Sequence, residues 1–186
     1  KNRPTILITG ATKGIGRALV ARFAPAASAL HLVARNGQDL EALKEELSAV
    51  DCTVQVYPCD LSEALSVEAL INDLQTHLTE LDVLINNAGV YLPGALLTEP
   101  AGNLHYMMQL NVLSHYELVR GLYQKMPRGS HVIHMASVAS RKRFDGKTNI
   151  DIWRKLDDTD KSAVMFFKMV RNVASSWNRT VPTCTV

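Results

Sequence analysis

Short apolar runs alternate along the chain with segments whose apolar residues have helical spacing. The apolar runs that fit β-strands occupy residues 6–8, 30–34, 54–57, 83–85 and 131–135. The segments with helical spacing occupy residues 14–23, 38–47, 62–78, 103–125 and 161–177. Short strands separated by helices predict parallel pairing, with helices on both faces of the sheet. Right-handed crossovers then give a doubly wound sheet, a three-layer α/β fold.

Local signals refine the bounds of these helices. Pro25 follows the first helix and predicts its end. In the second helix, Leu40, Leu43 and Leu47 lie on one face, which predicts that this face is buried. Ser62 stands at the start of the third helix, where its hydroxyl predicts an N-cap.

Length and charge exclude several classes of protein. The 186 residues predict a single domain, residues 1–186, with a sizeable core. The net charge of +2 and the dispersed basic residues give no reason to expect a nucleic-acid partner. The basic run at residues 141–143 is interpreted as a solvated loop.

The cysteines and the apolar runs bear on the compartment. Cys52, Cys59 and Cys184 have no metal-ligand spacing, so no metal site is expected. An odd number of cysteines without a signal peptide predicts reduced thiols in a cytoplasmic protein. Cys59 is expected to be buried in the core. No apolar run approaches the length of a membrane span, so no membrane partner is expected.

One segment points to a binding site. The glycine-rich stretch at residues 9–16 follows the first apolar run and opens the first helix. Glycines allow the backbone to turn tightly, and the helix N-terminus offers free N–H groups and a positive dipole end. This is the geometry that holds the phosphates of a dinucleotide. A second segment, Asn86-Asn87-Ala88-Gly89, follows the fourth apolar run.

Together, the two segments resemble the short-chain dehydrogenase/reductase family, whose glycine pattern is T-G-x-x-x-G-x-G and whose fourth strand ends in N-N-A-G. The resemblance runs from about residue 5 to about residue 174 and is strong through Ser137. It implies a Rossmann-type dinucleotide-binding fold. The family has further elements beyond the sixth strand that would begin near residue 181, so we expect a fold truncated at its C-terminal end.

Both the resemblance and the charges favour NADP(H) as the cofactor. The second strand is followed by Arg35, where NAD-preferring members of the family have an acid, and Lys13 lies inside the glycine turn. Two cations suit a 2′-phosphate, although both could be solvated surface residues. Asp60 matches the family's adenine-binding acid or is a helix N-terminal acid. The predicted cofactor-binding residues are Gly10, Thr12, Lys13, Gly14, Ile15, Gly16, Arg35, Asp60, Leu61, Asn87, Ala88 and Gly89.

The resemblance also implies a catalytic set that is incomplete here. Asn111 matches the family's helix Asn, which holds a water in the proton relay, although a structural role is the alternative. Ser137 matches the Ser that polarises the substrate oxygen. The family's Tyr is absent, because every tyrosine precedes Ser137. Lys161 is the preferred match for the catalytic Lys, with Lys155 as the other register, and both registers place an aspartate at the Tyr position.

Two functions are therefore open. The first is an NADP(H)-dependent oxidoreductase that interconverts a small-molecule carbonyl and an alcohol by hydride transfer. The second is a catalytically impaired NADP(H)-binding module, a sensor or scaffold. The family also implies a homo-oligomer, a dimer or tetramer that pairs through the helices at residues 103–125 and 161–177.

Overall fold

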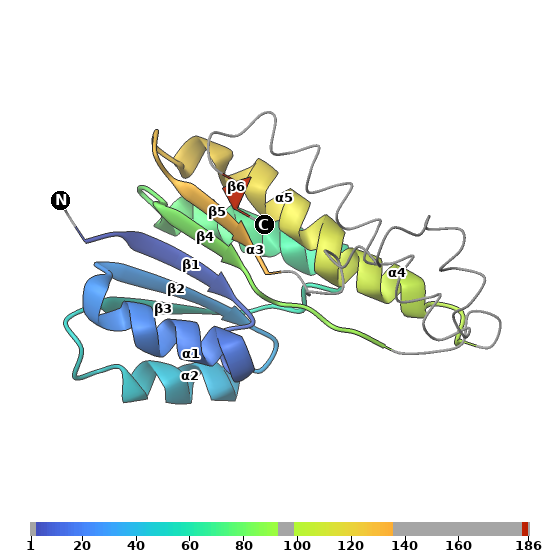
Figure 1. The fold of residues 1–186 in the computed structure, drawn as a ribbon, viewed down its shortest axis with the longest axis horizontal. Coiled ribbons are helices and arrows are strands. Elements are labelled where there is room, and N and C mark those ends of the chain that lie inside the picture. The colour runs from blue at the N-terminus through green and yellow to red at the C-terminus, as the bar shows by residue number, and fades with distance from the viewer. Residues whose placement is uncertain (1–2, 93–98, 136–183, 186) are drawn as a thin grey trace, which may run out of the picture.

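The computed structural model describes residues 3–92, 99–135 and 184–185. Six parallel strands form one sheet in the order β3-β2-β1-β4-β5-β6 (Figure 1). The strands are β1 (Thr5–Thr9), β2 (Ala29–Ala34), β3 (Thr53–Pro58), β4 (Val83–Asn86), β5 (His131–His134) and β6 (Cys184–Thr185). The five strands predicted before residue 136 are confirmed, with bounds that differ by at most a residue or two.

Helices cover both faces of the sheet, so the predicted three-layer doubly wound fold is confirmed (Figure 1). One face carries α1 (Gly14–Phe23) and α2 (Gly37–Glu46). The other face carries α3 (Ala64–His77) and α5 (Ser114–Leu122), while α4 (Asn103–Met108) lies beyond the ends of the strands (Figure 1). A 3₁₀ turn, Ala24–Ala26, follows α1 and contains Pro25. The predicted helix at residues 161–177 lies outside the described part of the chain.

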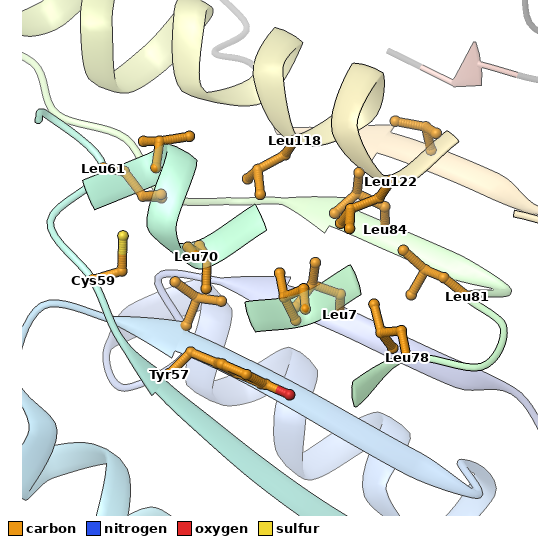
Figure 2. Close-up of a cluster of buried hydrophobic side chains, with 14 of the residues drawn as sticks. Leu7, Tyr57, Cys59, Leu61, Leu70, Leu78, Leu81, Leu84, Leu118 and Leu122 are labelled. Atoms are coloured by element: carbon orange, nitrogen blue, oxygen red, sulfur yellow. The ribbon is translucent and has the colours of Figure 1, made fainter. Parts of the chain in front are cut away.

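The central strands β1, β2 and β4 are buried on both faces, which explains why they are short apolar runs rather than alternating ones. Ile6, Ile8 and Ile85 face α1 and α2. Leu7 and Leu84 face α3 and α5 (Figure 2). The predicted apolar face of α2 is buried, with Leu40, Leu43 and Leu47 all in the core. The central strands are therefore held in register by packing on both sides.

The long helix predicted at residues 103–125 has the expected extent but is not regular. Between α4 and α5 lies a π-helical turn, Gln109–Leu113, and a 3₁₀ turn, Tyr123–Lys125, follows α5. Just after the π turn, the Ser114 hydroxyl donates to the Leu110 carbonyl at 2.7 Å. The π turn places Asn111 at the irregular point of the helix, and such turns are frequent at functional sites.

The prediction that Ser62 caps α3 is wrong. The helix begins at Ala64, and its N-cap residue Glu63 makes no side-chain capping bond. Instead, the Asp60 carboxylate accepts from the Ser62 backbone N–H at 2.9 Å and from the Ser62 hydroxyl at 2.6 Å. This local turn occupies the Ser62 side chain and delays the start of the helix.

None of the helices in residues 3–92 and 99–135 is long and apolar enough to cross a bilayer.

The core of the α3 and α5 face can be tested at Leu84, which is fully buried on a central strand. We expect Leu84→Ala to lower the free energy of unfolding by about 2–5 kcal/mol, because it removes buried methyl groups and leaves a cavity. Urea unfolding followed by circular dichroism measures the change. Leu65→Ala is the control, since Leu65 on α3 is 81% exposed. Equal losses for the two variants would contradict the packing described here.

Candidate functional site

A cleft of about 420 Å³ lies at the carboxyl ends of the strands. Loops that follow β1, β2, β3 and β4 line it, at the point where the strand order turns from β2-β1 to β4. Ligands of doubly wound folds bind at this switch point. Nine of the twelve predicted cofactor-binding residues line the cleft: Gly10, Thr12, Lys13, Ile15, Arg35, Leu61, Asn87, Ala88 and Gly89.

The glycine turn brings the start of α1 against the backbone. A Cβ added to Gly16 would lie 2.0 Å from the Gly10 carbonyl oxygen, so only glycine fits there. Gly14 has φ +53°, a left-handed conformation, and a Cβ added to it would meet nothing within 4 Å. The N-cap residue Lys13 makes no side-chain bond to the helix, and the first turn of α1 has no acidic residue. The end of α1 thus suits an anion.

The two sequence segments singled out above are joined by hydrogen bonds. The Thr9 hydroxyl accepts from the backbone N–H groups of Asn87 and Ala88 at 3.0 and 2.9 Å. The Asn87 side-chain amide donates to the carbonyls of Thr9 and Gly10 at 3.0 and 3.3 Å. The end of β1 and the end of β4 therefore form one rigid floor for the cleft.

Helical side chains fix the rest of the segment that follows β4. Both ends of the Asn111 amide bind the Val90 backbone: Oδ1 accepts from the N–H at 2.8 Å, and Nδ2 donates to the carbonyl at 2.7 Å. His115 Nε2 binds the Ala88 carbonyl at 3.0 Å. Because a carbonyl only accepts, Nε2 carries the hydrogen. These contacts fit the alternative role of Asn111, which is structural. Its predicted part in a proton relay stays a prediction.

His115 belongs to a buried polar cluster under the cleft. Its ring lies 5.7 Å from that of His134, between ring centroids, and the Asn86 amide meets His134 Nδ1 at 3.3 Å. Burial lowers the pKa of His115 and of His134 to about 4, because it disfavours the charged ring. Both rings are therefore neutral at neutral pH. His115 was not predicted, although its position four residues after Asn111 places it near the same helix face.

The two predicted phosphate-binding cations lie on the lip of the cleft. Lys13 Nζ pairs with Asp39 Oδ2 at 3.6 Å, and the Lys13 side chain is 83% exposed. Arg35 Nη1 donates to the Tyr106 hydroxyl at 3.3 Å. Asp39 and Tyr106 also line the cleft but were not predicted, because they lie on α2 and α4 and only the folded chain brings these helices to the cleft.

The remaining predicted residues of this half lie at the end of β3. Leu61 is buried in the wall of the cleft. Asp60 instead lines an adjacent hollow of about 510 Å³, with its carboxylate bound to Ser62. Its predicted contact with adenine stays a prediction. Cys59 is buried as predicted; burial raises the pKa of its thiol to about 11, which keeps the thiol protonated.

The catalytic half of the prediction falls largely outside the described structure. Ser137 and Lys161 both lie in residues 136–183, so their placement is not described. Among residues 3–92, 99–135 and 184–185, no group of three His, Cys, Asp or Glu side chains could hold a metal ion.

Comparison with known proteins identifies the family. A family model described as short chain dehydrogenase matches residues 4–149, most of the chain. The chain belongs to the short-chain dehydrogenase family. A fatty acyl-CoA reductase of Mycobacterium tuberculosis is 35% identical to this chain over 136 residues. The match covers 71% of this chain and 46% of the relative. A sepiapterin reductase of Chlorobaculum tepidum is 34% identical to this chain over 148 residues, and the match covers 75% of this chain and 61% of the relative.

Solved structures agree with this family assignment. A short-chain dehydrogenase of Sphingobium yanoikuyae in complex with NADPH has a TM-score of 0.74 and 25% identity, and the match covers 95% of this chain and 64% of that one. The chain thus spans about half to two thirds of the length of these relatives.

The buried histidines predict how stability depends on pH. Burial lowers the pKa values of His31, His115 and His134 from 6.5 to about 4. Between these values the unfolded chain binds protons that the folded protein does not, so the free energy of unfolding falls as the pH drops from 6.5 to 4. We expect His115→Gln, whose amide can still donate to Ala88, to make this fall shallower. Urea unfolding at a series of pH values measures it; parallel curves for the two proteins would contradict the expectation.

Proposed function

We propose that the cleft binds NADP(H) and that the protein is an oxidoreductase that interconverts a small-molecule carbonyl and an alcohol. The observation that carries this proposal is the glycine turn at the uncapped N-terminus of α1, with Lys13 and Arg35 on the lip of the same cleft. An anion-binding helix end beside two cations matches a ligand with both a pyrophosphate and a further phosphate.

The residues present fit such a cofactor. Gly10, Thr12 and Ile15 line the cleft beside the start of α1, where the pyrophosphate would lie. Lys13 and Arg35 would hold the 2′-phosphate, and Arg35 follows the strand whose end receives the adenosine ribose in dinucleotide folds. When bound, the cofactor supplies or accepts the hydride. The NADPH complex of the Sphingobium yanoikuyae relative supports this assignment.

The protein's own side chains would position the substrate and the cofactor. Ser137, which follows the last residue of β5 by three positions in the sequence, would polarise the substrate oxygen, and Lys161 would bind the ribose. Asn111 and His115 fix the backbone at residues 88–90, so this wall keeps its shape when a ligand enters. Such fixed geometry lowers the cost of binding and orientation.

A second candidate is an NADP(H)-binding module without catalysis. The observation that favours it is in the sequence: the last tyrosine is Tyr123, before Ser137, and Asp157 stands four residues before Lys161. An aspartate beside a lysine is held ionised and cannot donate a proton to a developing alkoxide. Loss of the proton donor costs about two to four orders of magnitude in rate.

Assembly and compartment are part of the proposal. We infer a cytoplasmic homo-oligomer, a dimer or tetramer. Support for an oligomer comes from the long helix, on which Leu113 and Tyr123 are 43% and 52% exposed. Apolar side chains exposed on a helix suit contact with a second copy.

The cofactor site is tested with Arg35→Asp. We expect NADPH to bind the unmodified protein more tightly than NADH, and Arg35→Asp to weaken NADPH binding by about tenfold or more, because it replaces a charge-assisted hydrogen bond with repulsion. Titration calorimetry measures both cofactors. Arg128→Asp, the same charge change on an exposed residue at the opposite end of the sheet, should leave both affinities unchanged. Equal effects of the two variants would contradict the assignment.

Turnover separates the two candidate functions. The oxidoreductase should oxidise NADPH in the presence of at least one member of a panel of ketones and aldehydes, and Ser137→Ala should abolish this activity while leaving NADPH binding intact. Absorbance of NADPH measures the rate. Tight binding of NADPH without turnover by the unmodified protein would favour the binding module instead.

A further inference from the structure

Asp39 places a negative charge among the groups that would hold the cofactor's 2′-phosphate. Its carboxylate lies 3.6 Å from Lys13 Nζ, and its side chain is 36% exposed. Asp39, Lys13 and Arg35 all line the same cleft. Asp39 belongs to the first turn of α2.

The position of Asp39 is fixed by the helix that carries it. Asn36 is the N-cap of α2, and its side chain accepts from the backbone N–H groups of Gln38 and Asp39 at 2.9 and 3.3 Å. Leu40 and Leu43 are buried on the sheet side of α2. With the start of the helix and its inner face both fixed, the first turn of α2 is held at the edge of the cleft.

The two cations differ in the side chain that each already contacts. Arg35 hydrogen-bonds the neutral Tyr106 hydroxyl, whereas Lys13 pairs with the Asp39 carboxylate. A phosphate that binds Lys13 must share it with Asp39 or displace that carboxylate, and in either case lies near the negative charge of Asp39. A free 2′-hydroxyl carries no charge and meets no such opposition.

We propose that Asp39 is a specificity-determining residue that reduces the preference for NADPH over NADH, because its carboxylate is already the ion-pair partner of Lys13. This inference rests on the proposed NADP(H) site. The cleft would therefore accept NADPH with less selectivity than two unopposed cations would give.

The test is Asp39→Asn, which keeps the size of the side chain and removes its charge. We expect NADPH to bind about fivefold more tightly and NADH to change by less than about twofold, the effect of one nearby unit charge in a largely aqueous setting. The gain should shrink at high salt, because exposed charges are screened. Titration calorimetry with each cofactor, at low and high salt, measures these changes.

Glu41→Gln is the matched control. It removes the same charge from the same helix, but Glu41 is outside the lining of the cleft and lies 4.0 Å from Lys44. Thermal unfolding of both variants reports any loss of helix stability. If Asp39 only stabilises the start of α2, its substitution changes both cofactor affinities equally.

The outcomes separate this inference from the proposed function. Tighter NADPH with unchanged NADH for Asp39→Asn alone supports the inference. Unchanged NADPH affinity, an equal change for both cofactors, or the same shift with Glu41→Gln overturns it and leaves the NADP(H) site standing. Failure of the unmodified protein to bind either cofactor overturns the proposed function and this inference with it.

Discussion

The cleft depends on the close contact between the backbone after β1 and the segment after β4. Gly16 approaches the Gly10 carbonyl so closely that no side chain fits, and the Asn87 amide donates to the same carbonyl. Neighbouring parallel strands bring their carboxyl ends together, and here the hydrogen bonds of Thr9 and Asn87 lock the two loops to one another. A backbone fixed in this way can present N–H groups to a ligand without first being ordered.

The helical layer adds a second constraint. Three hydrogen bonds from Asn111 and His115 reach the backbone at residues 88–90, so the wall of the cleft is held from the helix as well as from the sheet. Burial keeps the His115 ring neutral, and the bond to the Ala88 carbonyl fixes its tautomer, with the hydrogen on Nε2. In effect, polar groups that would be costly when unpaired in a core are used there to position the backbone.

The fold could be predicted from the sequence because strands buried on both faces leave unmistakable apolar runs, and because Pro25 and the glycine turn punctuate them. Most of the lining of the cleft could be predicted from the same turns, since residues that follow parallel strands must meet. Asp39 and Tyr106 could not, because they lie on α2 and α4 and only the folded chain brings these helices to the cleft. The irregular turn at Asn111 was also missed, since its apolar spacing resembles that of an ordinary helix, and Ser62 was misjudged because Asp60 competes for it.

The π turn at Gln109–Leu113 has a consequence for how this protein is compared with others. A π turn accommodates one residue more than the regular helix, and each residue of an α-helix advances the helix by about 100°. The phase of α5 is therefore offset from that of α4 by one residue. An alignment with a relative whose helix is uninterrupted needs a single-residue gap here. Without that gap, an alignment that is correct in α4 would match His115 to a position on a different face of the relative's helix.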